Sequence, residues 1–231
     1  MSIPRPTAAD EVVLALETSC RAASVALGHG GETRSKTLDP TCSHASDLLP
    51  ALDTLLAAAG LQPGELTRII VGTGPGSYTG LRVGSALGQG LARGSGAQLL
   101  GIPSGEGLAF SRLEPGTEGV HLLDARAGQV TFTRFSRTEH DVLVSARPAV
   151  LDPAELTAEM LEGAVLFADA AALTAADLGQ RFIDGGSDDT PPHARHLLAL
   201  DHSRRQAGIA PAETSVMPLY LRPYAARIKE R

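Results

Sequence analysis

The stretch that decides how this chain folds is Ile69-Ile70-Val71-Gly72-Thr73-Gly74-Pro75-Gly76-Ser77-Tyr78-Thr79-Gly80-Leu81-Arg82-Val83-Gly84. Its apolar start predicts a buried strand, and the helical spacing of apolar residues from Leu81 to Leu91 predicts a helix over residues 79–93. The glycines between them predict a tight turn, whose backbone N–H groups are free to face an anion at the helix N-terminus. The stretch is not a P-loop, because no Gly-Lys-Ser/Thr follows, and its glycine spacing differs from that of a dinucleotide fingerprint.

Glycine recurs at every fourth residue of this predicted helix, at Gly80, Gly84 and Gly88, and so lines one face. A second row of small residues consists of Ala86, Gly90 and Gly94. Each glycine costs a helix interior about 1 kcal/mol relative to alanine, so a gain in packing must compensate. The glycine face either packs on the chain's own sheet or docks closely on another subunit. We expect the docking role, and the two rows can serve one purpose each.

Composition limits the class of protein. The 231 residues suit one large or two small domains, and with only 3% aromatic residues the core must be aliphatic. A net charge of −6 argues against a stand-alone nucleic-acid binder, although an acidic protein can act on RNA within a complex. No signal peptide or membrane-spanning run is evident, so we expect a cytoplasmic protein with no membrane contact, in which Cys20 and Cys42 stay reduced.

Expected strands and helices alternate along the chain in two similar series, which predicts an α/β fold. The first series has strands over residues 12–16, 22–27, 33–38, 69–71 and 99–101, and helices over residues 43–59, 79–93 and 104–111. We expect Pro50 to kink the helix over residues 43–59. From Gly119 the pattern restarts, with a strand–turn–strand over residues 120–132, strands over 141–145 and 165–167, and helices over 153–162 and 194–206.

The prediction is two related ββ(β)αβα subdomains, of which the second is smaller and eroded. We expect a flexible arm over residues 1–10 and an N-terminal subdomain over residues 11–115, which contains the helices that dock a partner. The smaller C-terminal subdomain and a basic tail then occupy residues 116–231.

Several short motifs resemble those of a known family. They are Leu14-Ala15-Leu16-Glu17-Thr18-Ser19, Ser43-His44-Ala45, the block from Gly74 to Gly84, Asp124-Ala125-Arg126 and Pro218-Leu219-Tyr220-Leu221-Arg222. With the duplicated halves, they are similar to the actin-like ATPase superfamily and, within it, to the TsaB family, also called YeaZ. The Gly-Pro-Gly-Ser-Tyr-Thr-Gly block is the specific motif, and the resemblance covers nearly the whole chain. It implies an actin-like, RNase H-like fold for each subdomain.

The resemblance also implies a function, which is a role in making N6-threonylcarbamoyladenosine (t6A) in tRNA. In that pathway TsaD transfers the threonylcarbamoyl group, and TsaB is a non-catalytic partner that activates TsaD by forming a heterodimer through helices. TsaE, an ATPase, joins through the TsaB–TsaD complex, so contact with tRNA is indirect, and the same helices can form a homodimer when TsaD is absent. The expected partner-binding residues are Leu48, Leu52, Leu55, Thr79, Gly80, Arg82, Val83, Gly84, Leu87 and Gly88.

Two turns occupy the positions that carry chemistry in actin-like kinases. There, the carboxylate of the first hairpin serves magnesium and phosphate. Here Glu17, with Thr18 and Ser19, is either a nucleotide contact of this kind or a strand-end carboxylate bonded to local backbone. Asp124 and Arg126 stand at the equivalent turn of the second half, as an ion pair or as ligand-binding groups.

We expect no metal site, because TsaD-like proteins hold their metal with two histidines four residues apart on a helix, and His193 and His196 are three apart. The second half also lacks a clear phosphate turn, since Asp184-Gly185-Gly186-Ser187 is a poor candidate. We therefore expect no catalytic residue and no cofactor in the isolated chain, and ATP or ADP at the interface of the complex stays open. The alternative function is a stand-alone actin-fold ATPase or small-molecule kinase. The basic tail over residues 222–231 is either solvated or contacts tRNA or TsaD.

Overall fold

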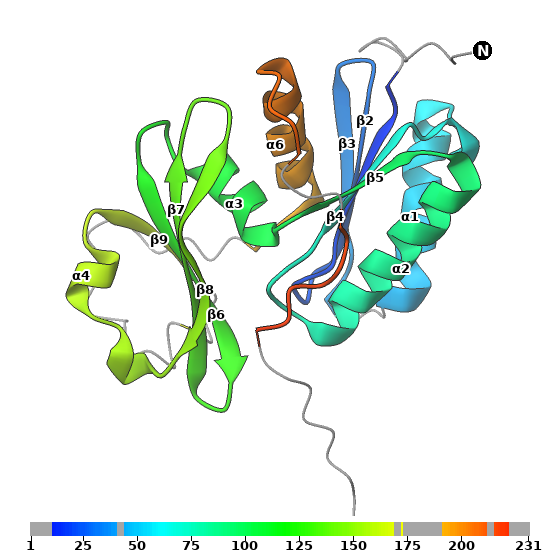
Figure 1. Cartoon of the computed structure of the whole chain (residues 1–231). Helices are drawn as coiled ribbons and strands as arrows, with labels where there is room; N and C mark the ends of the chain where they lie inside the picture. Colours follow the sequence, from blue (N-terminus) through cyan, green and yellow to red (C-terminus); the bar gives the residue numbers. More distant parts are fainter. Residues whose placement is uncertain (1–10, 41–43, 169–171, 173–190, 212–214, 222–231) are drawn as a thin grey trace, which may run out of the picture.

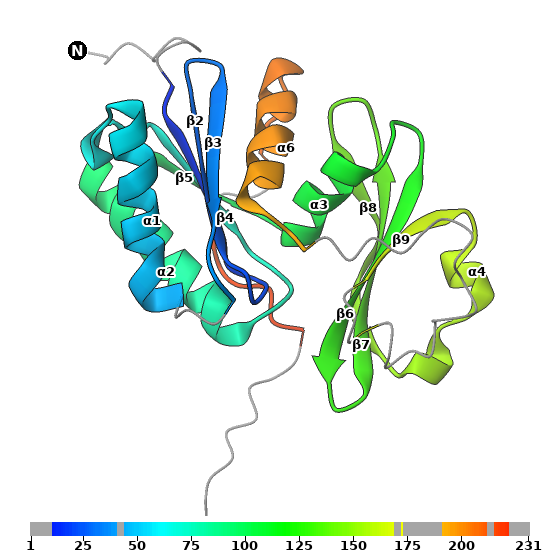
Figure 2. The ribbon, with the colours of Figure 1, turned by 180° about the vertical axis from the view of Figure 1, so that it is seen from behind.

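The chain forms two β-sheets that lie side by side, each with helices against it (Figures 1 and 2). The computed structural model describes residues 11–40, 44–168, 172, 191–211 and 215–221. Sheet A has five strands in the order β3-β2-β1-β4-β5, and sheet B has four in the order β8-β7-β6-β9. None of the described helices combines the length and the apolar composition needed to cross a membrane. The expected arm, Cys42, residues 184–187 and the tail lie outside the described residues.

Sheet A is built around β1 (Val13–Glu17), whose five residues are all buried. This strand pairs antiparallel with β2 (Ser24–His29) and parallel with β4 (Arg68–Gly72). The outer strands are β3 (Glu32–Thr37) and β5 (Gln98–Ile102). The continuous apolar runs of β1 and β4 suit strands that are covered on both faces. The strands expected in the first series are therefore confirmed, with small shifts in their ends.

Helices α1 (His44–Ala59) and α2 (Tyr78–Ser95) cover one face of sheet A (Figure 1). A 3₁₀ turn (Pro63–Glu65) separates α1 from β4. The N-cap of α2 is Ser77, whose Oγ accepts a hydrogen bond from Gly80 N at 3.2 Å. The helix ends at Gly96, which adopts the left-handed conformation with a φ of 74°. α1 continues through Pro50 as a single helix.

Sheet B repeats the order of sheet A on a smaller scale. β6 (Glu118–Arg126) pairs antiparallel with β7 (Gln129–Arg137) and parallel with β9 (Ala164–Ala168), and β8 (Val142–Leu151) forms the far edge. These strands correspond in order to β1, β2, β4 and β3, and the described part of the chain adds no counterpart of β5 to sheet B. The prediction of two related subdomains, of which the second is smaller, is confirmed.

The helix expected over residues 153–162 is wrong in part. The chain instead forms a 3₁₀ turn (Pro153–Glu155) and a short helix α4 (Ala158–Leu161). Leu156 and Thr157 between them have extended backbone angles, with ψ of 112° and 158°, and this interrupts the helix.

Two helices cross between the halves, as Figures 1 and 2 show. They are α3 (Ser104–Arg112) and α6 (Ala194–Gln206). Helix α3 follows β5 in sequence, yet its Leu108 packs in one cluster with Phe135 and other residues of sheet B. Helix α6 follows β9, yet its Leu197 packs with Ile70 and other residues of sheet A. The division predicted after residue 115 follows the sequence but not the packing, because each series ends in a helix that covers the other sheet.

The small residues of α2 divide into an inner and an outer row. A methyl group at Gly84 would overlap Thr18 Oγ1, and one at Gly88 would lie 2.5 Å from Val71 Cγ2 of β4. Gly90, in the other row, has no atom within 4 Å of the position a Cβ would take, and the same holds for Gly94. The inner row thus packs inside the chain, with Gly84 against the turn after β1, Gly88 against sheet A and Gly80 buried, which corrects the expectation that this row docks on another subunit. The outer row of Ala86, Gly90 and Gly94 is exposed.

Alanine substitutions in the two rows should have opposite effects on stability. Gly88→Ala should lower the free energy of unfolding by about 1–3 kcal/mol, because the methyl group must displace Val71 in a close-packed core. Gly90→Ala should raise it by about 0.5–1 kcal/mol, because it reduces the entropy of the unfolded chain without creating a clash. Urea unfolding at one protein concentration measures both, and effects of the same sign would contradict this division of the rows.

Candidate functional site

A cleft of about 1150 Å³ lies between the two halves, and the motifs that the sequence singles out meet along it. Ser19 lines it from the β1–β2 turn, Gly76 and Ser77 from the start of α2, and Asp124 and Arg126 from the end of β6. A segment near the C-terminus, residues 219–221, completes the lining. Two turns far apart in sequence, predicted to be equivalent in the two halves, therefore border the same space.

Glu17 lies at the end of β1 and is completely buried. Its Oε1 accepts a hydrogen bond from the backbone N–H of Ser19 at 2.7 Å, while Oε2 has no hydrogen-bond partner among the described residues. Burial raises the pKa of Glu17, and hydrogen bonds from Ser19 oppose this rise. The carboxyl is thus bonded to local backbone, as one of the two interpretations predicted. Of the three residues predicted to contact a nucleotide, Ser19 lines the cleft, whereas Glu17 and Thr18 do not.

The glycine-rich turn before α2 uses several of its N–H groups within the protein. Gly74 N donates to Ser104 Oγ of α3 at 3.1 Å, and Ser77 N donates to the carbonyl of Ser19 at 2.6 Å. These bonds connect the turn to α3 and to the turn between β1 and β2. The N–H groups of Gly74 and Ser77, expected to face an anion, therefore point inward, and the turn is a junction between elements.

The turn after β6 carries the second predicted pair. Arg126 and Ala127 adopt left-handed backbone angles, with φ of 67° and 53°. Asp124 Oδ1 accepts a hydrogen bond from the backbone N–H of Arg126 at 2.8 Å, and Asp124 Oδ2 lies 3.9 Å from Arg126 Nε. The predicted ion pair forms, and it lies on the wall of the cleft.

One histidine and one cysteine at the cleft have pKa values that burial shifts away from their ordinary range. Burial lowers the pKa of His121 to about 4, so this ring is neutral at neutral pH. Burial also raises the pKa of the Cys20 thiol to about 12, which disfavours the thiolate that a nucleophile requires. Across the described residues, His193 and His196 included, no group of three or more His, Cys, Asp or Glu side chains is placed to hold a metal ion.

Two exposed tyrosines stand at the cleft, and the sequence contains no local signal that pairs them. The rings of Tyr78 and Tyr220 lie 4.8 Å apart between centroids. Tyr220 reaches this position on the C-terminal strap, defined here as residues 215–221, which is held to α2 by a 2.8 Å hydrogen bond from Ser85 Oγ to the Val216 carbonyl. The pair arises only because the strap returns along α2 from the far end of the chain.

The structure buries most of the residues predicted to bind a partner. Leu48, Leu52 and Leu55 of α1 expose no more than 7% of their surface and belong to the core of sheet A. They form the apolar stripe that this amphipathic helix turns toward its own sheet, which leaves them little surface to offer a partner. The same holds for Gly80, Gly84 and Gly88 of the inner row, which are also buried.

The other residues predicted to bind a partner keep some accessible surface. Thr79 and Arg82 are exposed on α2, and Val83 and Leu87 are half-buried against the core of sheet A. The structure adds Leu49 of α1, whose surface is 46% exposed, together with the outer row of α2. Of the predicted set, the accessible surface of the α1–α2 layer therefore retains Thr79 and Arg82, and in part Val83 and Leu87.

Comparison with known proteins identifies the family. A family model described as TsaD, tRNA N6-adenosine threonylcarbamoyltransferase, matches residues 41–182. The chain belongs to this family. Among curated relatives, the tRNA threonylcarbamoyladenosine biosynthesis protein TsaB of Haemophilus influenzae is 35% identical over 127 residues, which cover 54% of each chain. TsaB of Escherichia coli is 30% identical over 132 residues, which cover 56% of this chain and 57% of that protein.

Solved structures agree with this placement within the TsaD family. A structure of YeaZ from Pseudomonas aeruginosa superposes with a TM-score of 0.75 and 27% identity, over 91% of this chain and 100% of that one. A second Pseudomonas aeruginosa structure, of an uncharacterized protein with similarity to peptidase YeaZ, gives the same TM-score at 28% identity over 92% of this chain and all of that one. The chain spans about half the length of the curated relatives it matches. The resemblance to TsaB, or YeaZ, is confirmed, as is the two-subdomain fold.

The buried carboxyl of Glu17 gives a test based on pH. Because its pKa in the folded protein is raised, its contribution to stability is present at low pH and is lost as the pH rises through the folded-state pKa. Glu17→Gln keeps the shape and removes the titration. The free energy of unfolding of the wild type, minus that of Glu17→Gln, should therefore fall as the pH rises from 5 to 8. Urea unfolding at each pH measures the difference, and parallel profiles would contradict a raised pKa.

Proposed function

We propose that this member of the TsaD family is a TsaB-type subunit that takes part in making t6A in tRNA. In this proposal it is non-catalytic and activates TsaD by forming a heterodimer through α1 and α2. The observation that carries the proposal is the outer row of α2, in which Gly90 and Gly94 have open space and Ala86 is exposed. A helix face with no side chain larger than a methyl group lets the backbone of another helix approach closely.

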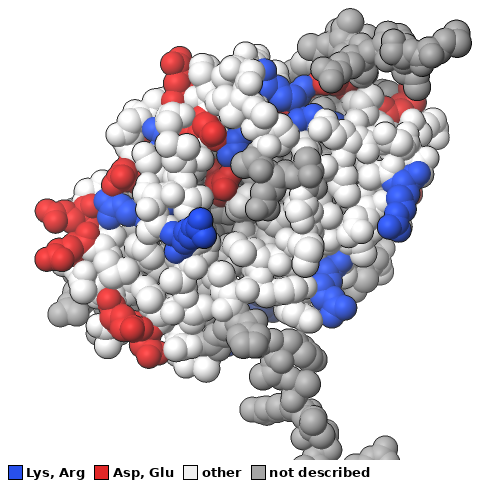
Figure 3. Space-filling view, in the orientation of Figure 1, with Lys and Arg blue, Asp and Glu red and all other residues white. Residues whose placement is uncertain are grey.

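The surroundings of the outer row support a protein partner. Leu49 of α1 is an exposed apolar side chain, and Arg82 of α2 is an exposed cation whose Nη1 donates to the Tyr78 hydroxyl at 3.1 Å. Figure 3 shows that the side of the molecule where α1 and α2 lie is mostly uncharged, with a few basic groups standing apart. A helical layer with a row of small residues, an exposed leucine and only scattered charges fits another helical layer better than it fits a nucleic acid. The same surface supports a homodimer of the chain when TsaD is absent.

The interior of the cleft supports a role without catalysis of its own. Glu17, which would serve magnesium in an actin-like kinase, is completely buried, and burial raises its pKa. Gly74 and Ser77 of the glycine-rich turn already donate their N–H groups to protein acceptors. Phosphoryl transfer depends on a carboxylate and N–H groups that reach the phosphates and their metal ion. We therefore propose that the isolated chain holds no cofactor, and that ATP or ADP binds only at the interface of the complex.

The remaining partners follow from the same proposal. TsaE joins through the TsaB–TsaD complex, and contact with tRNA is indirect, because the chain is acidic and the helical layer offers no basic stripe. A stand-alone ATPase or kinase is the competing function. A rise in the melting temperature of the isolated chain by several degrees with Mg-ATP would favour that competitor.

A bulky charge on the outer row should weaken the complex with TsaD. Ala86→Arg places a long cation on the exposed face without touching the core, so the fold should be retained while binding to TsaD from the same host weakens by roughly tenfold or more. Gel filtration with light scattering measures the complex, circular dichroism measures the fold, and a reconstituted t6A assay should lose activity in parallel.

The matched control is Ala158→Arg, which makes the same change at an exposed alanine of α4, on the far sheet. It should bind TsaD as the wild type does. A wild-type chain that ignores TsaD would reject the proposed partner. A complex that survives Ala86→Arg would reject the docking face alone.

A further inference from the structure

The C-terminal strap runs along one flank of α2, antiparallel to the helix. At one end Ser85 Oγ donates to the Val216 carbonyl at 2.8 Å, and at the other end the ring of Tyr220 packs on the ring of Tyr78. Ser85 lies seven residues after Tyr78, which is close to two helical turns, so both face the same side of α2. The strap and this side of the helix therefore form one continuous surface.

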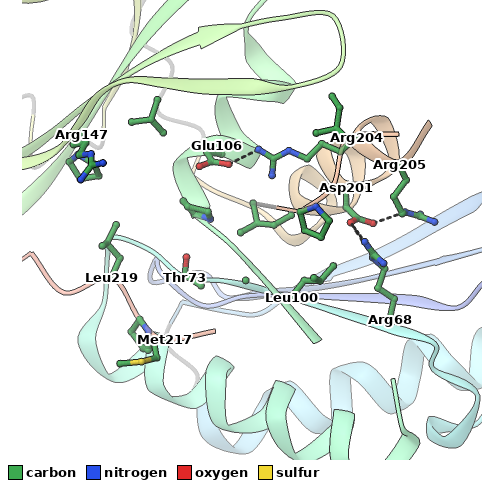
Figure 4. Close-up of a pocket in the computed structure, with 18 residues that line it drawn as sticks. Arg68, Thr73, Leu100, Glu106, Arg147, Asp201, Arg204, Arg205, Met217 and Leu219 are labelled. Carbon is green, nitrogen blue, oxygen red and sulfur yellow. Dashed lines mark hydrogen bonds and ion pairs between the residues drawn. The ribbon is translucent and has the colours of Figure 1, made fainter. Parts of the chain in front are cut away.

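Sheet A also holds the strap in place. Leu219 N donates to the Thr73 carbonyl, just beyond the end of β4, at 2.8 Å, and Figure 4 shows the strap, with Met217 and Leu219, passing between Thr73 and α2. A Cβ at Gly101 of β5 would overlap the carbonyl oxygen of Ser215, so the strap packs directly on the backbone of β5. Because these contacts order the strap in advance, its exposed side chains lose little entropy when they bind a partner.

The outer row of α2 continues into the surface that the strap extends. Counting back from Ala86 in steps of four residues gives Arg82 and then Tyr78, and all three are exposed. Residues spaced by four along a helix form one of the ridges through which helices pack against each other. This ridge has small residues in its C-terminal half, and at its N-terminal end it has an arginine and a tyrosine beside the strap.

The N-terminal end of the ridge has the composition typical of the centre of a protein interface. Tyr78 and Tyr220 expose 37% and 43% of their surface, although their ring centroids are 4.8 Å apart. The Arg82 guanidinium lies 5.4 Å from the centre of the Tyr78 ring, and its Nη1 donates to the Tyr78 hydroxyl at 3.1 Å. Tyrosine and arginine are enriched among the few interface residues that carry most of the binding energy.

The charge of this cluster indicates what it binds. Among the described residues Arg82 bonds to the Tyr78 hydroxyl but forms no ion pair with a carboxylate, so its charge suits an acidic side chain of a partner. The other exposed arginine of α2, Arg93, lies eleven residues further on, about 16 Å along the helix. Two cations at this spacing are too few for a nucleic-acid backbone, whose binding depends on the neutralisation of several phosphates.

We propose that the strap and α2 dock TsaD together. The Tyr78–Tyr220 pair packs against apolar side chains of a TsaD helix, and Arg82 pairs with a TsaD carboxylate. This inference rests on the proposed function and extends it, because it adds the C-terminal strap and two tyrosines to the docking surface. A helix that covered both rings would remove a large apolar area from water on a support that is already ordered.

The test measures the affinity of the full chain for TsaD from the same host by isothermal titration calorimetry. Tyr220→Ala should weaken binding roughly tenfold or more, because it removes one ring of the pair. Tyr220→Phe keeps the ring and should bind within about twofold of the wild type. Arg82→Glu should weaken binding roughly tenfold or more at about 0.05 M NaCl, and the loss should shrink at about 0.5 M NaCl, because salt screens the charge pair.

The matched controls lie on β8 of sheet B. Leu143→Ala removes a side chain that is 53% exposed, and Arg147→Glu reverses the charge of an exposed arginine. Both should leave the affinity for TsaD unchanged at either salt concentration. Circular dichroism and the melting temperature of each variant report whether it folds, which Tyr220→Ala and Arg82→Glu should do because both side chains are exposed.

The outcomes separate this inference from the proposed function. A wild-type chain that does not bind TsaD would reject the proposed function itself. A complex that Ala86→Arg weakens, but that Tyr220→Ala and Arg82→Glu leave intact, would keep the docking face and overturn the role of the strap. The inference is also overturned if Tyr220→Ala weakens self-association of the chain, or its binding to tRNA, and leaves the affinity for TsaD unchanged.

Discussion

The arrangement of the two sheets depends on charged side chains that helix α6 buries between them. Arg204 donates to Asp141, before β8, at 2.6 Å and to Glu106 of α3 at 2.8 Å, and one turn earlier Asp201 accepts from Arg68 of β4 at 3.0 Å. Removing such groups from water costs several kcal/mol each unless their partners stay in place, so the network defines geometry more than it adds net stability. It holds α6 against sheet A through Arg68 and against α3 and sheet B through Arg204. The cleft is bordered by turns from both sheets, so its shape depends on this connection.

Local patterns in the sequence predicted most of the helices and strands and the repetition of the fold in two halves. The apolar run before Gly72, the glycine-rich turn and the apolar spacing from Leu81 predicted a strand, a turn and a helix, and all three are present. The restart near Gly119 predicted sheet B. Periodicity could not predict that α3 covers sheet B and α6 covers sheet A, because it gives a helix an apolar face without saying which sheet that face meets. Periodicity also could not predict the position of the strap or the Tyr78–Tyr220 pair, since both depend on a contact between distant parts of the chain.

The glycines of α2 show the same limit at the level of single residues. Helical spacing correctly separated two rows of small residues, but it could not say that Gly84 and Gly88 face Thr18 and Val71 while Gly90 faces open space. The inner row brings α2 so close to β1 and β4 that a methyl group does not fit. A helix held this closely presents its outer row as a rigid surface, and a rigid surface loses less entropy when it binds a partner. Internal packing and the proposed docking are therefore two uses of one helix, on opposite faces.

The packing of the turn after β1 supports the proposal that this cleft has no phosphate site of its own, although the motif resembles one. A side chain at Gly72 would overlap the carboxyl of Glu17, Thr18 lies against Gly84, and the carbonyl of Ser19 accepts the N–H of Ser77. Three consecutive residues, for which a nucleotide contact was one of two interpretations, are thus in contact with α2 or with the strand and turn that lead into it. In an actin-like kinase the same positions must stay open to a metal ion and to phosphate. Glu17 and Thr18 are enclosed by this contact with α2 and β4, and of the three residues only Ser19 lines the cleft. The close fit that would make α2 a firm docking surface in the proposed complex therefore works against catalysis at this strand end.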